Sequence, residues 1–330
     1  SAASDVYKRQ SLNEAFMPLY PRREFVKLLA GASLAPTWLS APRYSLAGGW
    51  DEVEAIRARI QRPVIPDRSF DVTDFGAVGD GQRDCSEAIS AAVAAATAAG
   101  GGRVVVPAGD YLTGPVHLQS RIELHLEKAA RLVFIPEPER YLPAVFTRWE
   151  GLELMGYSPL IYAFGQKNVA VTGGGVLDGG ADRATWWHWK GGRWAIGDDH
   201  PTQHAARQAL MADAENGVPP EQRIYADGAY LRPPFIQPFR CENVLIEGVT
   251  IRAAPFWLVN PVLCRNVTVR GVTCESLGPN SDGCDPESCK NVLIEDCYFD
   301  TGDDCIAIKS GRNADGRRIA TPCENIVIRN

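Results

Sequence analysis

A short unit recurs four times in the last third of the chain, and this repeat restricts the possible folds more than any other feature of the sequence. Its copies are CENVLIEGVTI from residue 241, CRNVTVRGVTC from 264, CKNVLIEDCYF from 289 and CENIVIRN from 323. Apolar residues alternate with other residues within each copy, which indicates short strands with one buried face. Successive copies begin 23, 25 and 34 residues apart, a spacing typical of stacked coils. The sequence therefore predicts an all-β protein, a single-stranded parallel β-helix whose coils cover one another.

Each copy of the repeat carries an asparagine at its third position: Asn243, Asn266, Asn291 and Asn325. Asparagine tolerates a positive φ, and its side chain bonds nearby backbone groups. We therefore expect the asparagines to form one tight left-handed turn in each coil.

The spacing of the nine cysteines does not match that of a metal-binding cluster. No CxxC pair is present and histidine is scarce, so a zinc site is not expected. Cys274 and Cys297 fall where apolar residues would point inward, and buried thiols behave as small hydrophobic groups. An exported protein can pair some of its cysteines, and the sequence does not settle the pairing.

Earlier segments fit the same plan. EAISAAVAAATAAGGG (87–102) predicts a helix ended by glycine, and such a helix would cover the open N-terminal edge of the stack. Residues 103–134 read as several short strands. Between about 179 and 237 the periodicity disappears, and we interpret this stretch as a long loop inserted into the stack. The β-helix domain is thus expected over residues 70–330, after a linker or N-terminal helix at 48–69.

Composition limits the possible partners. The chain has 330 residues, 45% of them hydrophobic, which is ample for a large core in one domain or two. A net charge of −6 does not suit a nucleic-acid-binding protein, which normally has a basic face. No segment resembles a membrane span, and nothing in the sequence indicates a cofactor; we expect a monomer.

The N-terminus predicts export. PRREFVKLLAGASLAP (21–36) resembles a twin-arginine signal, with paired arginines before an apolar stretch too short to span a bilayer. Met17 stands where such a signal would begin, and SLA at 45–47 suits cleavage. We therefore expect residues 17–47 to be a signal peptide and residues 1–16 to be upstream or non-native sequence. The mature protein is expected in the periplasm or outside the cell. An amphipathic helix with surface arginines is the alternative.

Six aspartates gather within residues 278–311, and their spacing separates three of them from the rest. One coil separates Asp282 from the adjacent pair Asp303 and Asp304, so the three should lie side by side, about 4.8 Å apart along the stack. Like charges at that distance raise at least one pKa. A protonated and an ionised carboxyl group are the equipment for cleaving a glycosidic bond. The remaining acids are expected to be solvated turn or surface residues: Asp285, Asp296 and Asp300.

Two motifs carry a family resemblance. NSDGCD (280–285) and GDDCIAIKSG (302–311) resemble the polygalacturonases, glycoside hydrolase family 28, as do the opening segments DFGAVGDGQRDCSEAI (74–89) and GGRVVVPAGDYLTGP (101–115). The resemblance covers most of residues 70–330. It implies a right-handed parallel β-helix that hydrolyses α-linked galacturonosyl bonds of pectin with inversion. The family's Asn-Thr-Asp motif reads Asn280-Ser281-Asp282 here.

The resemblance also implies roles for the acids. Asp303 corresponds to the general acid, and Asp282 and Asp304 to the residues that activate water. Asn280 corresponds to a substrate-binding position. A calcium site built from the same carboxylates is the alternative, as in some pectate lyases of similar fold.

Two further residues are candidate substrate contacts. Lys309 either meets a sugar carboxylate or balances the nearby aspartates. Trp187 either stacks on a sugar ring or anchors the inserted loop. Arg232 is expected to be structural. A large loop beside the cleft would block one end of it, which favours exo over endo cleavage.

The family's Gly-His-Gly and Arg-x-Lys motifs do not occur in the chain, and the last repeat stops at residue 330. The sequence therefore predicts a C-terminally incomplete catalytic domain that is inactive as it stands, and whose parent acts on pectic polysaccharides or oligogalacturonides. The alternatives are a rhamnogalacturonan hydrolase or a uronide lyase on the same fold, and a carbohydrate-binding β-helix without turnover.

Overall fold

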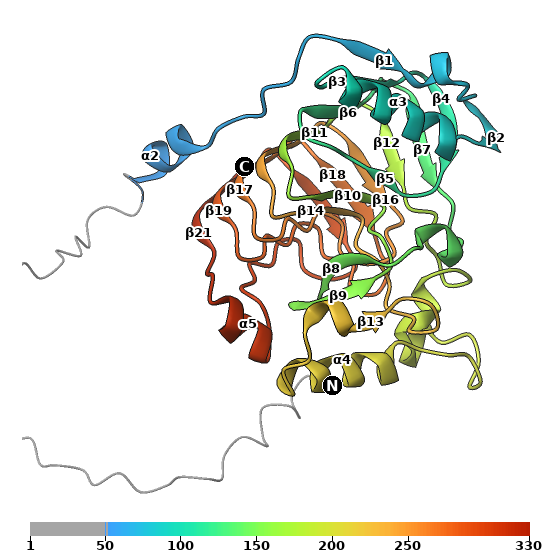
Figure 1. The fold of residues 1–330 in the computed structure, drawn as a ribbon, viewed down its shortest axis with the longest axis vertical. Coiled ribbons are helices and arrows are strands. Elements are labelled where there is room, and N and C mark those ends of the chain that lie inside the picture. Colours follow the sequence, from blue (N-terminus) through green and yellow to red (C-terminus); the bar gives the residue numbers. More distant parts are fainter. Residues whose placement is uncertain (1–49, 51) are drawn as a thin grey trace, which may run out of the picture. The chain divides into compact units, whose positions relative to one another are not determined.

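The fold is a right-handed parallel β-helix (Figure 1). The repeat predicts the parallel stack, and the family resemblance implies its hand. The structure, a computed structural model, describes Trp50 and residues 52–330. Its largest sheet contains eight parallel strands in the order β1-β3-β6-β11-β15-β17-β19-β21. Their bounds are Ser69–Asp71, Gly102–Val106, Ile122–Leu126, Lys167–Gly173, Glu242–Glu247, Arg265–Arg270, Lys290–Glu295 and Glu324–Arg329.

A second parallel sheet forms another face of the helix, in the order β2-β4-β7-β12-β16-β18-β20. Its strands are Asp80–Asp84, Gly109–Thr113, Ala130–Phe134, Val176–Asp178, Thr250–Arg252, Thr273–Ser276 and Tyr298–Thr301. Each coil from β1 and β2 to β19 and β20 contributes one strand to each of the two sheets, and β21 adds an eighth strand to the first. A residue's neighbour in space is therefore about one repeat away in sequence. Val267, for example, pairs with Val244 on one side and Val292 on the other.

The third face is shorter. Strands β5 (Val116–His117), β10 (Ile161–Phe164) and β14 (Ile236–Phe239) form a parallel sheet. Single bridges continue this face through the later coils: Cys284 pairs with Val259 and Ile306, and Glu287 pairs with Val262 and Lys309. These bridges determine which residues of the aspartate-rich region lie above one another.

The predicted asparagine turns are present, and they form a ladder. Asn243, Asn266, Asn291 and Asn325 all have φ between 55° and 61°. Each side-chain amide donates to the carbonyl oxygen of the preceding asparagine side chain, over 2.9 to 3.1 Å. Asn168 begins the ladder, also with a positive φ. The side chains therefore bond one another from coil to coil, and the ladder fixes the stacking at this corner.

The core is built from the inward-facing apolar residues of the repeats. All nine cysteines are free thiols. Cys241, Cys264, Cys289 and Cys323 stand one above another, and the backbone N–H of each of the first three lies 3.2 to 3.4 Å from the next sulfur. Cys274 is fully buried as expected, whereas Cys297 is half-buried.

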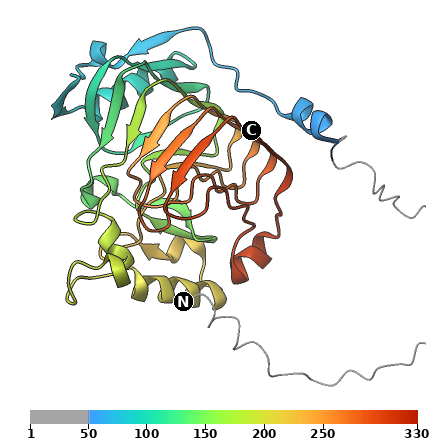
Figure 2. The same ribbon diagram turned by 180° about the vertical axis from the view of Figure 1, so that it is seen from behind.

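Helix α3 (Ser86–Ala98) confirms the predicted N-terminal cap. Its buried face consists of Ala88, Ile89, Ala92, Val93 and Ala96, and it packs on the first coils of the stack (Figures 1 and 2). The small alanines let the helix approach the strands closely, which covers the end of the core.

The residues expected to form a long inserted loop contain regular structure. Helix α4 (His204–Glu215) lies in the middle of this stretch, because HAARQALMADAE is rich in strong helix formers. Strand β13 (Ile224–Tyr225) pairs with β9 (Leu152–Gly156), which pairs antiparallel with β8 (Val145–Trp149). Leu210 and Ala214 of α4 are buried against β8, β9 and residues 229–257. The insertion therefore has a small core of its own, beside the helix α5 (Asn313–Ile319).

An extended segment precedes the first strand and crosses the outward face of the largest sheet. It follows helix α2 (Glu52–Arg59), which lies beside β19 and β21. Arg62 pairs with Glu247 at 2.9 Å, and the Val64 N–H donates to Asn168 Oδ1 at 3.2 Å. The segment thus runs from the last coils back to the first.

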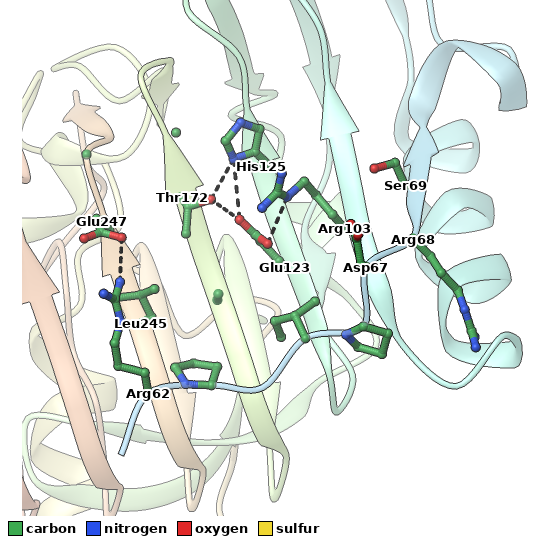
Figure 3. Close-up of a pocket in the computed structure, with 16 residues that line it drawn as sticks. Arg62, Asp67, Arg68, Ser69, Arg103, Glu123, His125, Thr172, Leu245 and Glu247 are labelled. Carbon is green, nitrogen blue, oxygen red and sulfur yellow. Dashed lines mark hydrogen bonds and ion pairs between the residues drawn. The ribbon is translucent and has the colours of Figure 1, made fainter. Parts of the chain in front are cut away.

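Figure 3 shows a cavity of about 670 Å³ beneath this segment. Its central carboxylate, Glu123, accepts hydrogen bonds from Arg103 and from Thr172, whose hydroxyl also lies 2.7 Å from His125 Nδ1. These polar groups satisfy one another, so we regard the cavity as a structural gap between segment and sheet.

Two N-terminal predictions, the signal peptide at 17–47 and the upstream sequence at 1–16, lie outside the described residues. Among the residues that the structure does describe, no helix is long and apolar enough to cross a membrane.

Candidate active site

Three aspartates meet where the repeat spacing predicts. Asp282 follows β18, and Asp303 and Asp304 follow β20, the next strand of the same sheet. Backbone bonds hold the two turns in register, since the Gly283 N–H donates to the Asp304 carbonyl at 2.9 Å. One carboxylate oxygen from each of the three residues lies within 4.8 Å of the others. The β-helix therefore brings together acids that are 21 residues apart in sequence.

The environments of the three acids differ. Asp282 is only 5% exposed, whereas Asp303 and Asp304 are exposed. Burial raises the pKa of Asp282, the nearby Lys309 charge opposes the rise, and Asp303 adds to it. The expected pKa rise is therefore present, although its main cause is burial and only secondarily the neighbouring like charge.

Asp285 corrects one expectation. The sequence placed it among the solvated surface acids, but its side chain is fully buried. Its carboxylate lies beneath the site cavity, 3.1 Å from the Nζ of Lys309, which lines that cavity together with Asp282. Burial and the charge of Asp282 raise the pKa of Asp285 to about 8. Asp296 and Asp300 are exposed, as predicted.

Lys309 connects the two buried acids. Its Nζ lies 3.1 Å from Asp285 Oδ2 and 3.4 Å from Asp282 Oδ2. The same atom lies 4.5 Å from the centre of the Trp257 ring, a cation–π arrangement. Lys309 is thus held between carboxylates and an indole, as the balancing interpretation predicts. That a remaining N–H of Lys309 also contacts the substrate stays a prediction.

Asn280 is held in place from beneath by Arg232. Arg232 is fully buried, and its guanidinium donates to the carbonyls of Pro255 and Pro279 and, at 2.9 Å, to Asn280 Oδ1. Asn280 has a φ of 54°, and its Nδ2 lies 3.4 Å from Asp303 Oδ2. Arg232 is therefore structural, as expected, but it also orients a residue that touches Asp303.

A buried ion pair lies under the far side of the site. Arg148 and Glu287 are almost fully buried, and their closest charged atoms are 3.6 Å apart. Burial raises the pKa of Glu287 and Arg148 opposes the rise. Above this pair, a cavity of about 520 Å³ is lined by residues of both motifs and by the β8–β9 turn, among them Glu150, Trp257, Asn280, Asp282, Asp303, Lys309 and Arg312. Arg312 is paired with Glu150.

The inserted segment forms another wall. A second cavity, of about 450 Å³, is lined by Arg183, Arg193, Trp194, Leu277 and Gly302. The first cavity is lined by Asp282 and Asp303, and the second reaches Gly302, the residue before Asp303. Trp187 anchors this wall: its indole N–H donates to the Ala254 carbonyl at 2.9 Å, and its ring packs edge-on against Trp194 at 5.6 Å. Its stacking on a sugar stays a prediction.

The glycines of the two motifs, Gly283 and Gly302, let neighbouring coils pack closely and do not leave room for a ligand. A Cβ on Gly283 would lie 2.3 Å from the Phe299 ring and 2.6 Å from the Cys305 carbonyl oxygen. A Cβ on Gly302 would lie 2.5 Å from the Gly278 carbonyl oxygen. Neighbouring coils therefore approach each other too closely here for any larger residue.

The three carboxylates also form a set that suits a hard cation such as Ca²⁺. Hydrolytic chemistry and cation binding are thus both compatible with the acids alone, and the calcium alternative stays open.

Sequence reasoning missed several residues around the acids. The burial of Asp285 had no signal, because it lies in a turn between the positive-φ residues Asn280 and Ser288, where strand alternation does not hold. The cations of the insertion had none, because residues 179–237 follow no period.

Two family models match the chain. Residues 225–326 match the model described as Glycosyl hydrolases family 28, and residues 69–125 match the model described as Rhamnogalacturonase A/epimerase, pectate lyase-like. The first of these ranges contains all three aspartates of the site.

Relatives that are similar to the chain include polygalacturonases. A probable polygalacturonase of Vitis vinifera is 31% identical over 273 residues, which are 79% of this chain and 48% of the relative. The solved exopolygalacturonase of Thermotoga maritima is 52% identical with a TM-score of 0.82, over 84% of this chain and 62% of that one. The family 28 exopolygalacturonase of Yersinia enterocolitica is 25% identical with a TM-score of 0.60, over 80% and 48%. The chain thus spans about half the length of the curated relatives.

Proposed function

The chain belongs to glycosyl hydrolase family 28, and from this membership we propose that the whole protein hydrolyses the galacturonosyl bonds of pectin, acting from a chain end. One observation carries the proposal: the β-helix places carboxylate oxygens of Asp282, Asp303 and Asp304 within 4.8 Å of one another, and Asp282 and Asp303 line a cavity. Exo action is supported by the inserted segment, which forms one wall of the site, and by the exopolygalacturonases among the similar structures.

We propose that Asp303 donates a proton to the glycosidic oxygen while Asp282 and Asp304 activate a water molecule. Asp303 suits the donor role because it is exposed, lines the 520 Å³ cavity and is held by Asn280. As the bond breaks, the leaving oxygen takes the proton from Asp303. Water attacks the anomeric carbon and gives its proton to Asp282 or Asp304.

The spacing of the acids makes the stereochemistry worth measuring. Inverting glycosidases typically separate their two carboxyl groups by about 6.5–9.5 Å, and retaining ones by about 5–5.5 Å. The oxygens here lie within 4.8 Å. Inversion is therefore proposed from the family resemblance and not from the distance. Proton NMR of the first product decides: the β-anomer supports inversion, and the α-anomer assigns one aspartate as a nucleophile.

Product analysis tests the function itself. The whole protein is incubated with polygalacturonate, and reducing ends and ultraviolet absorbance are followed together. Hydrolysis releases monomer or dimer from chain ends and produces no absorbance. Absorbance from an unsaturated sugar, abolished by a chelator, would instead identify a calcium-dependent lyase. Binding without either signal would identify a carbohydrate-binding module, and turnover only of rhamnogalacturonan would replace the substrate.

We also propose export through a twin-arginine signal at residues 17–47, on the sequence pattern described above. A fusion of these residues to a reporter tests this. Export that persists after both Arg22 and Arg23 are replaced by lysine contradicts the proposal.

A further inference from the structure

Binding an acidic polymer beside several aspartates requires cations that are not already neutralised. Lys309 is engaged by Asp282 and Asp285, and Arg312 by Glu150. These two cations of the motif region therefore carry little free positive charge toward a ligand. The question is which other groups face the acids.

The inserted segment supplies such groups from residues 183–194. Arg183 and Arg193 are exposed and line the 450 Å³ cavity that reaches Gly302. Lys190, half-buried on the same segment, is close enough to Glu150 and Asp303 for their charges to act on it. Within residues 52–330, none of these three cations forms an ion pair with a carboxylate.

The two guanidinium groups are also held in position by the fold. Arg183 Nη2 donates to the Ala195 carbonyl at 2.7 Å, and Arg193 lies 5.3 Å from the centre of the Trp194 ring. Trp194 packs on Trp187, which is bonded to the stack through Ala254. A guanidinium that is oriented in advance loses less side-chain freedom when it binds a carboxylate in a bidentate manner.

We propose that Arg183 and Arg193, with the indole of Trp194 beside Arg193, form an anion subsite that holds a uronate carboxylate of the substrate at the turn of Gly302 and Asp303. The proposal rests on the function proposed above and identifies the part of the chain that recognises the acidic group. A methyl-esterified or neutral sugar lacks the charge that these arginines would bind. The subsite therefore selects de-esterified over esterified galacturonan.

Calorimetric binding of trigalacturonate and of its trimethyl ester, at low ionic strength, tests the subsite. We compare the unaltered chain, the Arg183→Gln/Arg193→Gln double variant, and Arg265→Gln, an exposed arginine on the outward face of β17 that serves as a matched control. The double variant is expected to bind trigalacturonate about tenfold or more weakly, because two charge-assisted contacts are lost. The ester should bind all three proteins alike, and the control should match the unaltered chain.

A second variant separates charge from structure. Arg183→Lys/Arg193→Lys keeps both charges and should recover part of the lost affinity, with a salt dependence close to that of the unaltered chain. Equal affinity of the unaltered chain and the double glutamine variant for trigalacturonate overturns the subsite alone. No binding of trigalacturonate by the unaltered chain overturns the subsite, whereas the proposed substrate is overturned separately, by the whole protein failing to hydrolyse polygalacturonate.

Discussion

Replacing Asp285 by asparagine removes a buried carboxyl group from beneath the acids, and we expect the change to stabilise the protein at neutral pH. The side chain of Asp285 is fully buried, and its surroundings raise its pKa to about 8. Asparagine has nearly the same shape and stays neutral at every pH. Lys309 keeps Asp282 as a partner in the variant, 3.4 Å away.

The magnitude follows from the two pKa values. An aspartate carboxyl has an ordinary pKa of 3.8, so in the unfolded chain Asp285 is ionised above about pH 5. In the folded protein it keeps its proton up to about pH 8. Folding therefore takes up one proton in this window, and the free energy of unfolding falls by about 1.4 kcal/mol for each pH unit. Below pH 3.8 Asp285 is protonated in both the folded and the unfolded state, and its effect on stability disappears.

Asparagine does not titrate, so the Asp285→Asn variant lacks this fall in stability with pH. Its free energy of unfolding should therefore gain about 2.7 kcal/mol relative to the parent chain between pH 5 and pH 7. Urea unfolding, followed by tryptophan fluorescence at pH 5, 6 and 7, measures the difference. Asp300→Asn, at an exposed position in β20, is the control and should show no such trend. Parallel stability curves for Asp285→Asn and its parent would refute a raised pKa for Asp285.

Three other substitutions test the site and the stack. Asp303→Asn in the whole protein should lower turnover of polygalacturonate by about 10²–10⁴-fold and leave the thermal unfolding midpoint unchanged, because it removes a proton donor at an exposed position; retained turnover contradicts the acid role. Gly283→Ala should destabilise by about 1–3 kcal/mol in denaturant unfolding, since its Cβ would lie 2.3 Å from the Phe299 ring; an unchanged midpoint would mean that the coils separate easily. Asn266→Ala loses two ladder hydrogen bonds and Asn325→Ala one, so the first should cost about 1 kcal/mol more than the second; equal costs would show that only the left-handed backbone matters.

The repeat made the coil-to-coil relations predictable. A residue and its neighbour one repeat later lie above each other, which is why Asp282 meets the pair Asp303 and Asp304. The sequence predicts only one asparagine turn in each coil, and the same rule explains why the asparagine side chains meet in one ladder. Both contacts follow from the spacing, because a stacked coil converts sequence distance into spatial contact.

The direction of a side chain within a turn was not predictable in the same way. Asp285 lies in a segment bounded by positive-φ residues, Asn280 and Ser288, where the strand alternation of inward and outward residues no longer holds. The sequence therefore did not reveal whether Asp285 faces solvent or the stack. The insertion posed a different problem: α4 follows from local helix propensity, but its place beside β9 depends on tertiary packing.

The periodic coils and the aperiodic insertion have different roles in the site. The coils supply the acids: Asp282 pairs with Lys309, and the exposed Asp303 and Asp304 lie beside Asp282, so the negative charge of the coils repels an acidic sugar. The insertion supplies Arg183 and Arg193 on the adjoining wall, and Lys190 on the same segment. A uronate approaching Asp303 is stabilised only if the positive charges of the insertion offset the negative charges of the coils. We infer that the chemistry of cleavage is set by the periodic part of the chain, while preference for an acidic over a neutral sugar depends on the aperiodic residues 183–194. Replacing those residues should therefore alter substrate choice before it alters the fold.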